Sequence, residues 1–338
     1  MAIGSAGAPG APAPAAPAAP STSSRPSPHP VDGRRQGLRR RRRRPNTLPY
    51  ALIAPAVAAL VVMLGYPLLR LGILSLQKFG LRQQFGQPPD WVGLDNYHRI
   101  LTDSYFWDVL WRTVTFAMVN VALTIGLGLL VALLMRALGR GMRLLVSIGL
   151  MLAWAMPALT ATVVWQWLFD TQYGLVNWAF TKVGIGDYQG HSWLSEPISF
   201  FMVATIIVVW MGIPFVAFTL FAAMSQIPKE IEEAACIDGA GPWQRFRDVT
   251  LSMIKPVLLI LTALSVLWDF RVFTQIYVLQ RAGGINRETN LLGVYAYRIS
   301  IGENRFDVGA AVAVVMVVIT LLLTVVYLRQ MARQEDLA

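Results

Sequence analysis

The sequence predicts an all-α membrane protein with six transmembrane helices. Of its 338 residues, 55% are hydrophobic and only 14% are charged, whereas a soluble domain carries about 25% charged residues. The mean hydropathy of +0.50 indicates a chain that lies largely in lipid. Six windows are apolar for about 20 residues, the length that crosses about 30 Å of hydrocarbon, and the alternation typical of a β-barrel is absent.

The first 47 residues predict a disordered cytoplasmic tail. Residues 1–30 contain eight prolines among Ala, Gly and Ser, a composition that buries too little apolar surface to order the chain. Residues 1–44 carry nine arginines and one acid, or +8 of the net charge of +10. The remaining 294 residues are close to neutral, so the basic charge of the whole chain does not indicate a nucleic-acid partner.

The apolar windows follow in order through residues 48–332, which we predict to form one transmembrane domain in contact with membrane lipid. The first window begins near Tyr50, too far from the start for a cleavable signal peptide, so we expect it to remain as a helix. Several windows contain prolines, which kink a membrane helix without excluding it. The predicted spans are 50–75, 108–135, 144–169, 198–224, 256–279 and 308–328, and the prolines are Pro55, Pro67, Pro157 and Pro214.

Lysine and arginine set the expected orientation, because positively charged segments resist translocation. With the amino terminus in the cytoplasm, the inner segments carry 18 basic residues and the outer loops carry eight. The assignment depends on the run Arg39 to Arg44 beside the first span, since the tail supplies nine of the 18. We therefore expect a multi-pass protein of the cytoplasmic membrane with both termini in the cytoplasm.

Several chemistries lack their sequence signatures. A phosphate-binding P-loop needs Gly-Lys followed by Ser or Thr, and none of the four lysines follows a glycine. The three histidines and the single cysteine, Cys236, are scattered, without the short spacing of a metal site. No catalytic residue, metal or cofactor is therefore expected on this chain.

The loop 225–255, between the fourth and fifth spans, carries the most specific pattern. Pro228 suits the first position of a short helix, acids follow it, and Gly239 suits the position just past the end. Ile231, Ala234, Ala235 and Asp238 recur with helical spacing and share one face. The small residues on that face permit close approach by another backbone, whereas an interfacial helix that only seals the bundle is the alternative.

The stretch Glu233-Ala-Ala-Cys-Ile-Asp-Gly-Ala240, with Phe246 and Leu251 beyond it, resembles the EAA loop of permease subunits of binding-protein-dependent ABC importers. Where that family usually has proline after the leucine, this chain has Ser252, and Pro256 follows four residues later. That departure leaves the start of the fifth span open.

The resemblance implies a type I ABC importer permease fold and a set of partners. These would be a second homologous permease subunit, two ATPase subunits that use ATP and magnesium, and an extracytoplasmic sugar-binding protein. The loop helix would dock in a groove of an ATPase subunit. Its implied docking residues are Glu233 and Asp238 as polar contacts, Ala234 and Ala235 as the packed face, Gly239 as the turn, and Phe246.

Two further stretches resemble the maltose-type, first-permease branch of that family. One runs from Trp91 to Leu101, and the other from Trp268 to Leu279 followed by Gly283 and Gly284. The second contains Asp269 and Arg271, charges that cost about 2.5–3.5 kcal/mol each at a helix centre and so usually face a cavity or a partner. On a continuous helix the two would point about 200° apart. Two roles are therefore possible for these residues: one of them touches the substrate, or they form a structural hydrogen bond inside the bundle. The candidates for the substrate path are Trp268, Asp269, Arg271, Gln275 and Tyr277.

Two other classes are weighed against an importer permease. A secondary transporter predicts inverted repeats and ion-coupling groups inside the spans, for which Asp269 alone is weak support. A membrane enzyme predicts clustered carboxylates in an outer loop, but Asp95, Asp103 and Asp108 are loosely spread. The sequence therefore favours a permease that imports a carbohydrate and depends on separate ATPases.

Overall fold

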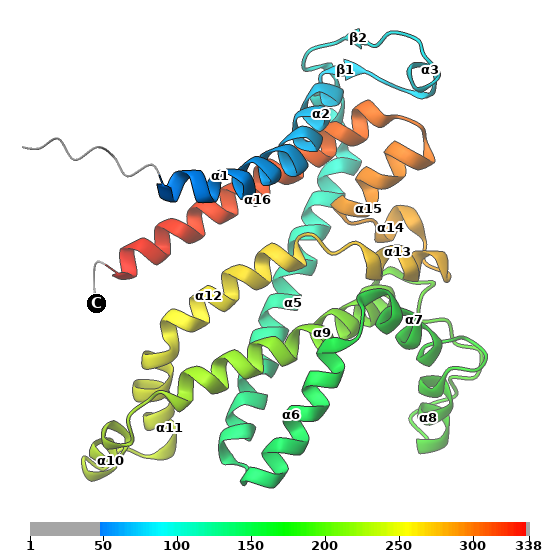
Figure 1. Ribbon diagram of the computed structural model, residues 1–338. Helices are drawn as coiled ribbons and strands as arrows, with labels where there is room; N and C mark the ends of the chain where they lie inside the picture. Colours follow the sequence, from blue (N-terminus) through cyan, green and yellow to red (C-terminus); the bar gives the residue numbers. More distant parts are fainter. Residues whose placement is uncertain (1–47, 336–338) are drawn as a thin grey trace, which may run out of the picture. The chain divides into compact units, whose positions relative to one another are not determined.

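The computed structural model describes residues 48–335 (Figure 1). The tail predicted over residues 1–47 lies outside the described residues. The chain divides into two units, residues 1–55 and 56–338. In the first unit the described residues, 48–55, are helical and open α1 (Leu48–Leu60); all contacts given below lie within the second unit.

Five helical stretches are long and apolar enough to cross a membrane. The first is Leu52–Ser75, where α1, a π-helical turn at Val61–Gly65 and α2 (Tyr66–Ser75) follow one another. The second, fourth and sixth spans are single helices. These are α5 (Ser104–Ala137), α9 (Pro197–Ser225) and α16 (Phe306–Glu335).

The third span is broken rather than kinked. Helices α6 (Arg140–Ala155) and α7 (Ala158–Leu168) meet at a bend of 102°, and only together do they provide a sixth span. The break follows from Pro157, because the residue before a proline is driven out of the helical region. Met156 accordingly has the extended angles φ −73° and ψ 126°.

The fifth span starts earlier than predicted and is interrupted near its end. Helix α11 (Pro242–Gln244), a π-helical turn at Arg245–Thr250 and α12 (Leu251–Asp269) follow one another without a break. The helix therefore runs through Pro256 instead of starting there. It stops at Asp269, and α13 (Thr274–Arg281) resumes after a short turn.

Shorter elements connect the spans. A two-stranded antiparallel pair, β1 (Gln77–Lys78) with β2 (Asp90–Trp91), pairs Gln77 with Trp91 and Lys78 with Asp90. The connecting helices are α3 (Leu81–Gln84), α4 (Asp95–Thr102), α8 (Leu175–Val183), α10 (Lys229–Ile237), α14 (Asn286–Thr289) and α15 (Leu292–Tyr297), which is followed by a π-helical turn at Arg298–Gly302.

Helices α5 and α9 pack most extensively, and α12 lies against both (Figure 1). Two glycines permit their close approach. A Cβ at Gly128 would come within 2.5 Å of the Val216 side chain, and one at Gly212 within 2.8 Å of Thr124. Since backbones approach closely only where side chains are small, these glycines fix the α5–α9 crossing.

Candidate functional site

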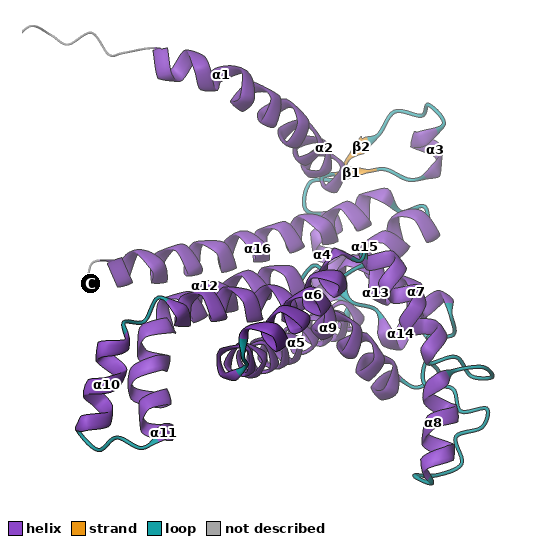
Figure 2. Ribbon diagram, turned by 60° about the horizontal axis from the view of Figure 1, so that its bottom comes forward, coloured by secondary structure: helices purple, strands orange, loops and turns teal. Residues whose placement is uncertain are grey.

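Helix α10, in the loop between the fourth and fifth spans, is the candidate docking element. It begins at Lys229 with Pro228 as its N-cap, one residue later than predicted, and Glu230 and Glu232 lie in its first turn. No residue of α10 is buried. Figure 2 shows α10 and α11 beside each other, joined by a loop. The short helix predicted from the sequence is therefore confirmed, and its surface is open to a partner.

The end of α10 is a Schellman turn centred on Gly239. Gly239 N donates to Cys236 O at 3.1 Å, and Ala240 N donates to Ala235 O at 3.0 Å. This pair of bonds requires a left-handed residue just past the helix end, and Gly239 has φ +81°. The predicted turn at Gly239 is confirmed, and it sets the direction in which the chain leaves the helix.

Polar contacts hold α10 against the rest of the molecule. Glu232 forms an ion pair with Arg136, at the end of α5. On the other side, Arg245 Nη1 donates to Cys236 Sγ at 2.7 Å, joining α10 to the helical turn before α12. Because no apolar residue of α10 is buried, the helix is positioned by these polar contacts and by the backbone that enters and leaves it.

The predicted docking residues differ in exposure. Glu233, Ala234, Asp238 and Gly239 are exposed, whereas Ala235 is partly buried. Phe246 is also partly buried, with its ring centroid 5.5 Å from that of Trp243.

The two most exposed large apolar side chains of this loop were not predicted as docking residues. Ile237 is 86% exposed and Trp243 is 69% exposed. Ile237 lies six residues after Ile231, so it does not lie on the helix face that the sequence analysis assigned to Ile231, Ala234, Ala235 and Asp238. An apolar residue outside that face was the available signal.

The substrate-path candidates do not share one helix. Trp268 and Asp269 end α12, Arg271 lies in the following turn, and Gln275 and Tyr277 lie on α13. The separation of about 200° expected for Asp269 and Arg271 assumed a continuous helix, and this was wrong because the helix stops at Asp269.

Asp269 and Arg271 nevertheless lie in different surroundings. Asp269 is buried, and its Oδ2 has no hydrogen-bond partner among residues 48–335. Arg271 is exposed.

Aromatic contacts connect the remaining candidates to neighbouring spans. The Trp268 ring lies 5.2 Å from Phe215 of α9, which stacks on Trp154 of α6 at 6.3 Å. On α13, Tyr277 stacks on Phe273 at 5.4 Å. Gln275 Nε2 lies 3.6 Å from Met211 Sδ of α9. The candidates thus lie where the third, fourth and fifth spans meet, in two groups separated by the turn.

A bundle of membrane-spanning helices with an exposed, turn-terminated helix before its fifth span defines the transmembrane permease class of ABC importers. The chain belongs to the family of binding-protein-dependent transport system inner membrane components, whose model matches residues 124–335. It is a multi-pass membrane permease rather than an enzyme.

Known proteins resemble the chain over most of its length. It is 45% identical over 288 residues to the diacetylchitobiose uptake system permease of Streptomyces coelicolor, covering 85% of this chain and 88% of the relative. It is 33% identical over 283 residues to the trehalose/maltose transport system permease of Thermococcus litoralis, covering 83% and 92%. A chain of a bacterial ABC transporter for alginate import has the same fold, with TM-score 0.72, 22% identity and coverage of 85% and 95%.

Proposed function

We propose that this chain is the permease subunit of an importer for a mono-, di- or oligosaccharide. The relatives that share 45% and 33% of its residues are permeases of uptake or transport systems for diacetylchitobiose and for trehalose/maltose. The observation that carries the mechanism is α10, which has no buried residue although it is closed by a regular Schellman turn. A short helix that is closed by a regular turn and leaves most of its side chains exposed suits insertion into a groove of another protein.

The partners follow from this role. A second, homologous permease would complete the translocation path, two ATPase subunits would receive the docking helices, and a sugar-binding protein would deliver the substrate outside. ATP and magnesium would be used by the ATPases. This chain would convert their closure into alternating access, with Glu233 and Asp238 as polar contacts, Ala234 and Ala235 packed against the groove, and Phe246 supporting the loop.

Uptake of radiolabelled sugar in a strain lacking this chain tests the function. Cells that carry the partner subunits should accumulate diacetylchitobiose, maltose or trehalose only when this chain is supplied. The complex should hydrolyse ATP, whereas the purified chain alone should not. Accumulation of none of these sugars, together with accumulation of a different class of solute, would contradict the proposal.

The proposed orientation places both termini and α10 in the cytoplasm. Cys236 gives a direct measurement, since it is the single cysteine of the chain and is exposed on α10. In cells that express this chain without its ATPase subunits, a membrane-impermeant maleimide should leave intact cells or right-side-out vesicles unlabelled and should label the chain after permeabilisation. Labelling of equal extent before and after permeabilisation would reverse the orientation.

A further inference from the structure

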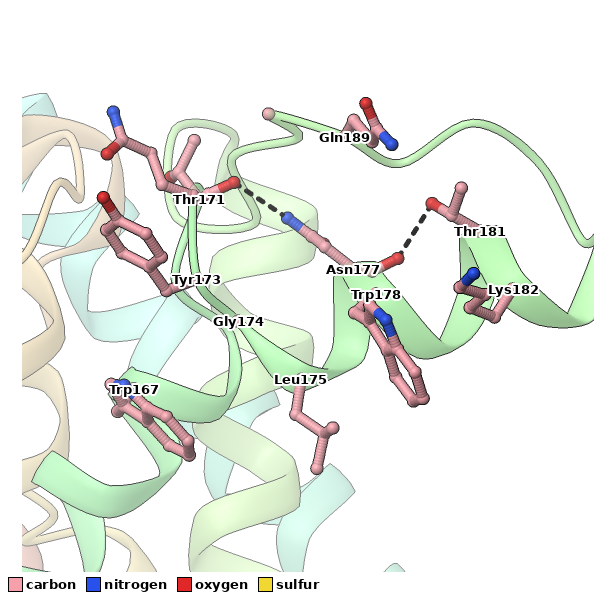
Figure 3. Close-up of a pocket in the computed structure, with 12 residues that line it drawn as sticks. Trp167, Thr171, Tyr173, Gly174, Leu175, Asn177, Trp178, Thr181, Lys182 and Gln189 are labelled. Atoms are coloured by element: carbon pink, nitrogen blue, oxygen red, sulfur yellow. Dashed lines mark hydrogen bonds between the residues drawn. The ribbon is translucent and has the colours of Figure 1, made fainter.

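Between the third and fourth spans, the end of α7, the loop 169–174, α8 and the loop that follows α8 line a pocket of about 520 Å³ that is open to the surface (Figure 3). We call it the α8 pocket. Its lining includes three aromatic side chains, Trp167, Tyr173 and Trp178, each more than half exposed. In Figure 3, Trp167 and Tyr173 lie on one side of Gly174, and Trp178 lies with Lys182 on the other. The proposed orientation places this segment on the outer face.

Backbone and side-chain hydrogen bonds fix the loop 169–174 before any ligand binds. One Asp170 carboxylate oxygen accepts from Gln172 N and Tyr173 N, both at 2.9 Å. These two donors hold the pKa of Asp170 below its usual value. At Gly174 a Cβ would lie 2.3 Å from Asp170 O, so the tight turn admits only glycine. The backbone at Tyr173 is therefore fixed by this turn.

Asn177 anchors α8 to the loops on both sides of it. Its Nδ2 donates to Thr171 O at 3.3 Å (Figure 3). It also donates to His191 O at 2.9 Å. Its Oδ1 accepts from Trp193 Nε1 at 2.6 Å, and the Trp193 ring is buried against Phe169 and Tyr188. Because Asn177 is satisfied internally, it holds α8 to the neighbouring loops and is not itself a free donor for a ligand.

We propose that the α8 pocket binds carbohydrate directly on the outer face of this chain, an inference that rests on the proposed function. The CH faces of a sugar ring stack on aromatic faces, which Trp167, Tyr173 and Trp178 supply. Sugar hydroxyls need donors and acceptors, which the amides of Gln172 and Gln189 supply. The volume lies in the range of about 300–1,000 Å³ typical of small-molecule sites.

The charges of the lining narrow the class of sugar. Lys182 is the one charged residue that lines the pocket, and no carboxylate does. The pocket therefore suits neutral or acidic sugars and disfavours cationic ones. Helix α7, which carries Trp167, packs along α13, where the substrate-path candidates Gln275 and Tyr277 lie. A sugar in the α8 pocket would rest one helix away from them.

Saturation-transfer NMR on the full-length chain in lipid nanodiscs, without its partners, tests the site. Diacetylchitobiose and maltose serve as probes, and the variants are Trp178→Ala, the conservative Trp178→Phe, and Trp91→Ala as a control. Trp91 is 67% exposed on β2, away from the pocket. We expect saturation transfer to at least one sugar in the wild type, Trp178→Phe and Trp91→Ala. Trp178→Ala should weaken binding about tenfold, as truncation of a central aromatic contact does.

Equal binding by the wild type and Trp178→Ala, or transfer to neither sugar, would overturn the inference. A third outcome is that brominated lipid quenches the tryptophan fluorescence, that this quenching is lost in Trp178→Ala, and that no sugar binds. That outcome would assign the pocket to the membrane surface and overturn the inference. The outcome is separable from that of the proposed function. Cells that import sugar while the purified chain shows no Trp178-dependent binding would remove this site alone. Binding without any import would remove the importer function and leave the site.

Discussion

Replacing Gly239 by valine is expected to reduce sugar uptake at least about tenfold while leaving the amount of permease in the membrane unchanged. Gly239 has φ +81°, and an L-residue in that region costs about 1–2 kcal/mol, with β-branched residues fitting worst. Helix α10 has nine residues and buries none of them, so it has little stability with which to offset that cost. The Schellman turn should therefore open, and the docking surface should lose its shape.

Two matched variants distinguish the cost of the left-handed backbone at Gly239 from a steric clash of the new side chain. A Cβ at Gly239 would meet no atom within 4 Å among residues 48–335, so the loss would not come from a clash within this part of the chain. Gly239→Asn should keep most of the uptake, since asparagine tolerates the left-handed conformation. Gly241→Ala should be neutral, because Gly241 has φ −66° and open surroundings. Uptake by Gly239→Val at the wild-type rate would argue against a docking role for α10.

The sequence predicted features that depend on neighbouring residues along the chain. Hydropathy located the spans, and the Pro–acid–Gly pattern located α10 and its left-handed end. These signals are local, since capping and helical periodicity act over a few residues. The docking roles of Glu233, Ala234, Ala235, Asp238, Gly239 and Phe246 remain predictions, as do the roles of the substrate-path candidates.

The features that the sequence did not predict depend on contacts between distant segments or on where a helix is interrupted. Pro157 predicted a kink, but the size of the 102° bend depends on the packing of α7 against α13. No proline marks the turn after Asp269, so a continuous helix was the reasonable expectation there. The α8 pocket was missed because its aromatic residues are spread over α7, a loop and α8, and tryptophan is common at any membrane interface.

The ion pair between Arg136 and Glu232 is another contact that the sequence could not predict, because 96 positions separate the two residues. The pair is partly shielded, with side-chain exposures of 34% and 27%. It connects α10 to the end of α5, the helix that packs most extensively against α9. Movement imposed on α10 by an ATPase would therefore reach the α5–α9 pair through this contact.

Breaking this ion pair is expected to uncouple ATP hydrolysis from transport. Arg136→Ala and Glu232→Ala should each lower uptake about fivefold, which corresponds to about 1 kcal/mol, the upper value for an exposed ion pair. ATP hydrolysis by the assembled complex should persist, so that the amount of sugar imported per ATP falls. If the two residues act together, the double alanine variant should be no worse than either single variant.

The ion pair between Arg247 and Asp248 provides the control. It joins adjacent residues of the same loop at 2.7 Å and is more exposed, with side-chain exposures of 61% and 53%. Replacing both residues by alanine should leave import per ATP unchanged, because this pair does not connect α10 to another helix. Additive losses from Arg136→Ala and Glu232→Ala would show that the two side chains act separately. An unchanged import-to-ATP ratio in both variants would show that the Arg136–Glu232 contact does not transmit movement. In that case α10 would be connected to the spans by the Arg245–Cys236 contact and by the covalent backbone on its two sides, at Ile227 and Thr250.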